Sequence, residues 1–129
     1  MTAYADLPPG WLMDDEAREL RRLAEGRTVL ELGAWKGRST VVLAEVAHYV
    51  VSVDRHEGIP EVGSEDSLPD YLSAVRQLGN VAIVVADFED IICLLGDFDV
   101  VYVDGNHDEE AAFRDATMAL SQRYRAGRT

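Results

Sequence analysis

Four short runs of almost wholly apolar residues constrain the fold of this chain more than any other feature. They are Thr28–Leu32, Tyr49–Val53, Val81–Val85 and Val100–Val103. Strands of this kind are buried on both faces, as in a parallel sheet covered by helices. Apolar residues recur at helical spacing between and after them, which predicts helices over residues 14–24, 39–47, 68–78 and 108–124. The alternation predicts a doubly wound α/β domain.

Size and composition narrow the class of protein. A chain of 129 residues is expected to form one domain, residues 1–129. Its net charge of −12 would repel a phosphate backbone, which argues against a nucleic-acid partner. The apolar runs are too short for a membrane span, and no secretory signal is visible. Cys93 is the sole cysteine, which favours a reducing cytoplasm and excludes a multi-cysteine zinc site.

Ligands of doubly wound domains bind beyond the carboxyl ends of the strands. The first strand runs into a loop bounded by Gly33 and Gly37, where glycine lets the backbone turn and approach a ligand. Ser39 is expected to cap the next helix, whose positive end suits a carboxylate or phosphate. The loop is not a dinucleotide fingerprint, because Trp35 stands at the middle glycine. A turn that needs its glycines for packing alone remains the alternative.

Acids follow the second and third strands. Asp54 lies about 20 residues after Gly33, where an acid accepts hydrogen bonds from ribose hydroxyls in such folds. Asp87 is placed to accept from an adenine amino group, with Phe88 packing near the ring. Each acid has a plainer interpretation as a turn residue, and Phe88 as a core aromatic. Together with the glycines they favour an adenosine-containing ligand.

The fourth strand ends at Asp104, and His107 follows it. Histidine is the side chain best suited to proton transfer near neutral pH, so His107 is a candidate base. The alternative is a solvated turn residue before a capped helix. His56 either lines an adenosine pocket or belongs to a loop, and the scattered histidines do not form a zinc-site pattern.

Three motifs in order are similar to those of a known family: residues 29–40, 51–54 and 101–107. They resemble class I S-adenosylmethionine-dependent methyltransferases, and most closely the bacterial small-molecule (macrocin-type) O-methyltransferases. The lead-in Gly10-Trp-Leu is also similar, and the resemblance covers about residues 10–125. It implies a Rossmann-like sheet in the order 3-2-1-4.

The resemblance also implies site residues. The Gly33–Gly37 loop would hold the methionine end of the cofactor, Asp54 its ribose, and Asp104 would lie near the amino group or a metal. Ser39 would reach the cofactor carboxylate, and His107 would be the catalytic base with Asp104 beside it. The cofactor-binding set is Glu31, Gly33, Ala34, Trp35, Gly37, Ser39, Asp54, Arg55, Asp87, Phe88 and Asp104.

Two departures from the family affect these expectations. Metal-dependent relatives carry a second Asp where this chain has Asn106, so a divalent metal is not favoured. The family sheet has seven strands and this chain supplies four, so it is expected to be a C-terminally shortened member. The edge of Val100–Val103 would then be open, which predicts a homodimer or higher oligomer that covers it.

The expected function is methyl transfer from S-adenosylmethionine to a hydroxyl of a small molecule. The alternative is a non-catalytic or minimal S-adenosylmethionine-binding module that works through an oligomer or a partner. A nicotinamide-binding domain is a third hypothesis, against which the absent Gly-x-Gly-x-x-Gly argues.

Overall fold

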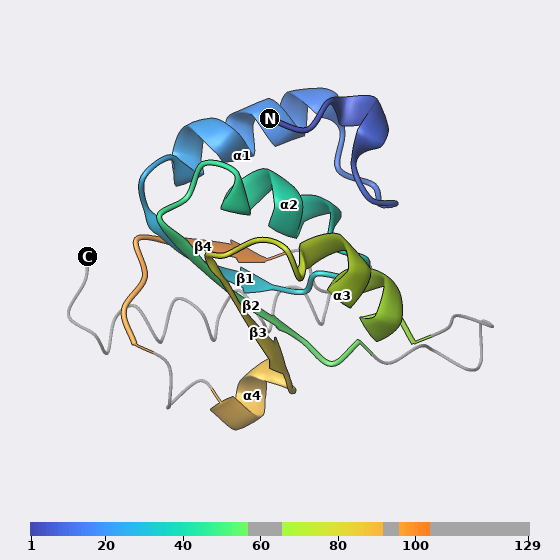
Figure 1. Ribbon diagram of the computed structural model, residues 1–129. Helices are drawn as coiled ribbons and strands as arrows, with labels where there is room; N and C mark the ends of the chain where they lie inside the picture. The colour runs from blue at the N-terminus through green and yellow to red at the C-terminus, as the bar shows by residue number, and fades with distance from the viewer. Residues whose placement is uncertain (57–65, 92–95, 104–129) are drawn as a thin grey trace.

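The computed structural model describes residues 1–56, 66–91 and 96–103. Its centre is a parallel sheet of four strands in the order β3-β2-β1-β4 (Figure 1). The strands are β1 (Thr28–Leu32), β2 (Tyr49–Asp54), β3 (Val81–Val85) and β4 (Val100–Val103). The predicted strands and their order are confirmed, because runs of β-branched residues between polar boundaries specify buried strands well.

Helices lie on both faces of the sheet (Figure 1). They are α1 (Asp14–Ala24), α2 (Arg38–Ala44), α3 (Leu68–Val75) and the short α4 (Phe88–Ile91), and a 3-10 turn spans Tyr4–Asp6. The first three pack on one face around Val29 and Val50. Phe88 of α4 packs on the other face with Leu30 and Val53. Adjacent strand residues thus enter different cores, as a doubly wound domain requires.

The helix ends differ from the sequence predictions. Gly37 is the N-cap of α2, in a left-handed conformation, so the expected cap at Ser39 is wrong. The helix also ends earlier than expected, at Ala44. Met13 is the N-cap of α1, and its backbone N–H donates to Glu16 Oε1 at 3.0 Å. The predicted helix over residues 108–124 lies outside the described residues.

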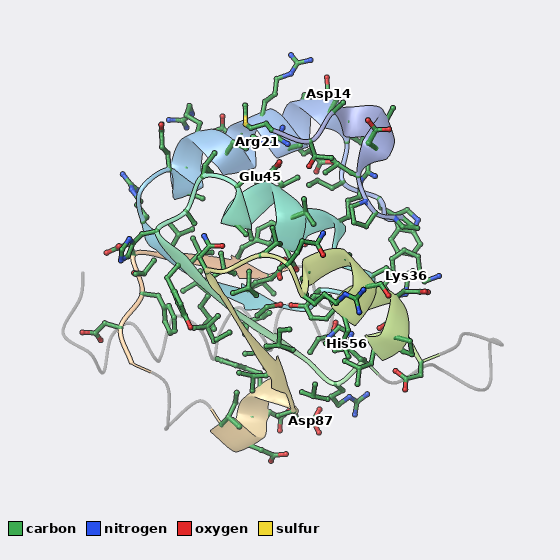
Figure 2. The ribbon with its side chains drawn as sticks, in the orientation of Figure 1. Asp14, Arg21, Lys36, Glu45, His56 and Asp87 are labelled. Carbon is green, nitrogen blue, oxygen red and sulfur yellow. The ribbon has the colours of Figure 1, made fainter. Side chains whose placement is uncertain are left out.

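The N-terminal segment is fastened to α1 and α2 by an ion pair. Arg21 Nη2 of α1 lies 3.0 Å from Glu45 Oε1 at the end of α2, and both side chains are only 14% exposed. Glu45 Oε2 also accepts the backbone N–H of Thr2, and Arg21 donates to the Thr2 carbonyl. Figure 2 shows the two side chains facing each other between the helices. These contacts hold Thr2 against α1 and α2, on the face of the sheet that the two helices cover.

Within the described ranges, the helices are all too short or too polar to cross a membrane.

We predict that Gly37→Ala destabilises the protein by about 1–2 kcal/mol, the cost of a left-handed conformation for a residue with a Cβ. Gly37 has a φ of 96°, and an added Cβ would meet Ala74, Val75 and Tyr71 of α3 at 3.2–3.4 Å. Urea unfolding measures the change. The control is Gly79→Ala, whose Cβ would have nothing within 4 Å. Equal stabilities of the two variants would contradict this account.

Candidate functional site

The carboxyl ends of β1 and β2 lie side by side. The strands pair in parallel with Leu32 opposite Val53, and Gly33 donates its backbone N–H to the Val53 carbonyl at 2.8 Å. The residues that follow the two strands therefore emerge next to each other. This brings Asp54 against the loop between β1 and α2, as the sequence predicts for the ligand-binding edge.

Three residues of the loop between β1 and α2 have a left-handed backbone conformation. Gly33, Trp35 and Gly37 have φ angles of 92°, 48° and 96°. Glycine adopts such angles freely, but a tryptophan there is uncommon and needs contacts that hold it. The loop is therefore a defined shape rather than a loose connection.

Asp54 supplies those contacts from the end of β2. Its Oδ2 accepts the backbone N–H groups of Ala34 at 2.7 Å and Trp35 at 2.9 Å. Its Oδ1 accepts the backbone N–H of His56 at 2.8 Å. One carboxylate thus fixes the loop after β1 and the turn after β2 together. Sequence spacing indicated a ligand role for Asp54, which stays a prediction, and its plainer interpretation as a turn residue agrees with the bond that it accepts from His56.

Glu31 and Ser39 lie beneath the loop. Glu31 is fully buried, and it accepts hydrogen bonds from Ser39 Oγ at 2.5 Å, Thr40 Oγ1 at 2.5 Å and Ser52 Oγ at 2.8 Å. These bonds tie the first turn of α2 to β1 and β2. The Ser39 hydroxyl, expected to face a cofactor carboxylate, faces Glu31. The contact of both residues with a cofactor stays a prediction, and the structure gives them a supporting position.

Burial raises the pKa of Glu31 to about 7, although the three hydroxyl donors act in the opposite direction. A carboxyl group surrounded by protein loses the hydration of its charged form, and this effect exceeds that of the donors. The core below the loop therefore contains a group that titrates near neutral pH.

The residues after β3 are divided between surface and core. Asp87 Oδ1 lies 3.2 Å from Arg55 Nε, and both side chains are about half exposed. This pair joins the segments that follow β2 and β3, at the predicted adenine end. Figure 2 shows Asp87 just beyond the end of β3. Phe88 instead is buried against Leu30 and Val53, as in the plainer interpretation of a core aromatic. Its contact with adenine stays a prediction.

His56 lies between the site and α3. It is only 3% exposed and left-handed, with a φ of 60°. Its Nδ1 lies 2.9 Å from Ser67 Oγ, and its ring centroid is 4.4 Å from that of Tyr71. Burial lowers the pKa of His56, which favours the neutral imidazole. Ser67 is the N-cap of α3 but makes no side-chain cap bond to that helix.

Two side chains without a role in the sequence predictions lie against Trp35. The ring centroid of Trp11, from the N-terminal segment, is 4.6 Å from that of Trp35. Lys36 Nζ lies 4.9 Å from the Trp35 ring centroid and 3.3 Å from Asp70 Oδ2 of α3. Aromatic residues far apart in the sequence carry no local sign that they will meet, which is why the sequence did not predict this cluster.

The predicted catalytic residues Asp104 and His107 lie outside the described residues. Within the part of the chain that is described, no group of three His, Cys, Asp or Glu side chains is arranged to hold a metal ion.

We predict that the stability of Glu31→Gln relative to the wild type rises between pH 5 and pH 8. A carboxyl whose pKa is about 7 when folded and 4.5 when exposed to solvent loses stabilisation as pH rises through this window. The uncharged amide avoids that loss, which amounts to roughly 3 kcal/mol. Urea unfolding of both proteins at the two pH values measures it. A stability difference that is the same at both pH values would show that Glu31 does not titrate there.

Comparisons with known proteins agree with this fold. Rv0187 from MTB, in a cofactor-bound crystal structure, superposes with a TM-score of 0.69 at 26% identity, over 92% of this chain and 55% of that one. The O-methyltransferase TomG from Streptomyces achromogenes, in complex with SAM, gives 0.67 at 23% identity, over 92% and 55%. An O-methyltransferase from Bacillus cereus, with SAH, gives 0.65 at 20%, over 92% and 56%.

The chain therefore spans little more than half the length of these three proteins. No curated protein matches its sequence. A family model described as a methyltransferase domain matches residues 30–127, which include the loop after β1, Asp54 and Asp87. The chain belongs to this methyltransferase-domain family.

Proposed function

We propose that the chain binds S-adenosylmethionine at the carboxyl ends of β1–β3 and transfers its methyl group to a hydroxyl of a small molecule. The observation that carries the proposal is the left-handed loop after β1, held by the Asp54 carboxylate within a domain of this family. The O-methyltransferases TomG and the Bacillus cereus enzyme, which share the fold and were crystallised with SAM or SAH, support the same choice.

The residues at this edge suit the proposed cofactor. Asp54 accepts three N–H groups, and a carboxylate offers about four lone-pair sites, so acceptor capacity remains for a ribose hydroxyl. Arg55 and Asp87 lie together beyond it, where the adenine would be bound. Gly33, Ala34, Trp35 and Gly37 form the loop that would hold the methionine end.

The bound cofactor would supply an electrophilic methyl group on a sulfonium. The main task of the protein is then to hold the acceptor hydroxyl in line with that methyl group. We assign the removal of the hydroxyl proton to His107, oriented by Asp104. No step here needs a metal, and a divalent ion remains the less favoured alternative.

We predict that His107→Ala leaves the affinity for S-adenosylhomocysteine unchanged and lowers turnover roughly 100-fold or more, as for a lost general base. Product formation with a panel of small hydroxyl acceptors measures turnover, and calorimetry measures affinity. A turnover equal to that of the wild type would remove His107 from the mechanism.

Two further parts of the proposal concern the setting of the site. β4 pairs with β1 along one side, and we propose that a second copy of the chain covers its other side. Light scattering at micromolar concentration would contradict this if it gave the mass of a monomer. We also propose a cytoplasmic location, because a chain with a single cysteine is typical of a reducing compartment.

Calorimetric titration with S-adenosylhomocysteine, compared with a nicotinamide dinucleotide, tests the proposed function. We expect micromolar binding of the first ligand only. Asp54→Asn and Asp87→Asn should each weaken it at least about tenfold, as expected when a charged hydrogen-bond acceptor is lost. Glu19→Gln, an exposed carboxylate on α1, is the matched control.

The two variants differ in one useful respect. Asp54 also holds the loop, so its variant changes the site in two ways, whereas Asp87 pairs with Arg55 at the surface. Loss of affinity in both variants supports a ligand that spans the two strand ends. A folded wild type that binds no S-adenosylhomocysteine would overturn the proposed function. Binding without methyl transfer to any acceptor would favour the alternative, a binding module.

A further inference from the structure

Arg38 is the first residue of α2, directly after the loop, and its side chain contacts residues 8–12 of the segment that precedes α1. Its Nε donates to the Leu12 carbonyl and its Nη1 to the Pro8 carbonyl, both at 2.9 Å. Its guanidinium carbon lies 4.6 Å from the ring centroid of Tyr4. A guanidinium presents several donors in one rigid plane, so it can hold two carbonyls of one segment at once. One arginine thus fastens residues 8–12 to the start of α2.

The packing around Gly10 keeps this segment close to the arginine. A Cβ at Gly10 would come within 2.7 Å of Arg38 Cδ. The Arg38 stem is fixed at one end by α2 and at the other by its hydrogen bonds, so it has little freedom to move aside. The segment therefore runs directly along the arginine side chain.

The same segment brings Trp11 to the loop. Trp11 stacks on Trp35 with ring centroids 4.6 Å apart and an interplanar angle of 36°, and it remains 65% exposed. A large aromatic residue that is so exposed contributes little to the core. Its contact with Trp35 instead helps to fix the conformation of the loop. Trp35 is the non-glycine residue of the loop that takes a left-handed φ, so contacts to its ring stabilise an otherwise costly conformation.

We propose that Arg38 is a positioning residue for the cofactor site: it holds residues 8–12 so that Trp11 stacks on Trp35 and fixes the loop in its binding conformation. The proposal rests on the proposed function, since it takes the loop to be the site of S-adenosylmethionine. Arg38 itself need not touch the cofactor. Its effect on affinity passes through Trp11.

A double-mutant cycle tests this route. Arg38→Ala and Trp11→Ala should each weaken S-adenosylhomocysteine binding about fivefold, the range expected for one lost aromatic pair. If Arg38 acts through Trp11, the double variant should lose no more than either single variant. Trp11→Phe, which keeps a ring for stacking, should restore most of the affinity. Arg22→Ala, an exposed arginine on α1, is the matched control.

Spectroscopy separates this route from a general loss of structure. Trp11 and Trp35 are the two tryptophans of the chain, so the tryptophan bands of the near-ultraviolet circular dichroism spectrum respond to the contact between their rings. Arg38→Ala should weaken the tryptophan signal, because Trp11 loses its fixed place on Trp35, while the far-ultraviolet signal of the helices is retained. Gly10→Ala should weaken the signal by displacing the segment, and Gly79→Ala should not. If Arg38→Ala fails to fold, Trp11→Ala and Gly10→Ala still test the stack, because both change the N-terminal segment outside the core.

The outcomes distinguish this proposal from the proposed function. Wild-type protein that shows the tryptophan signal but binds no S-adenosylhomocysteine would overturn the proposed function and this inference with it. Wild-type protein that binds the ligand, with affinity unchanged in Trp11→Ala, would overturn the positioning role alone. Additive losses in the double variant would also overturn it, because Arg38 would then act independently of Trp11.

Discussion

The Asp54 carboxylate is the contact on which the site depends. It accepts backbone N–H groups from two segments at the carboxyl edge of the sheet: two from the loop after β1 and one from the turn after β2. Without it, two backbone donors of a left-handed loop would lack a partner at the place where a ligand must approach. An acid at this position therefore shapes the site before it binds anything. The parallel pairing of β1 with β2 is what puts the carboxylate within reach.

The loop is supported from three directions by different chemistry. Below it, Glu31 ties the first turn of α2 to the sheet through buried hydroxyls. Beside it, Lys36 reaches Asp70 of α3. Above it, Trp11 lies on Trp35, and Arg38 holds the segment that carries Trp11. A short loop with unusual backbone angles keeps one shape only when its surroundings over-determine it. This arrangement is what a preformed cofactor site requires.

The sequence predicted what depends on local pattern. The four strands were predicted correctly because apolar, β-branched runs such as Val81–Val85 are typical of buried strands. The glycines of the loop were predicted correctly as turn residues because their positions need left-handed backbone angles. The error at the start of α2 has a tertiary cause. Ser39 and Ser67 have the residue type of helix caps, yet their hydroxyls serve Glu31 and His56. Phe88 is buried against Leu30 and Val53, which agrees with its interpretation as a core aromatic, and its contact with adenine stays a prediction. Tertiary partners of this kind cannot be read from neighbouring residues.

The central claim is that the loop held by Asp54 is the cofactor site. Titration of labelled protein with S-adenosylhomocysteine, followed by amide resonances, tests it residue by residue. The account predicts that the amides of Ala34, Trp35 and His56 shift most, because their acceptor is the carboxylate that would meet the ribose. Amides of α1, such as those of Glu19 and Arg22, should stay in place. Saturable binding that leaves the loop amides unmoved would contradict the account.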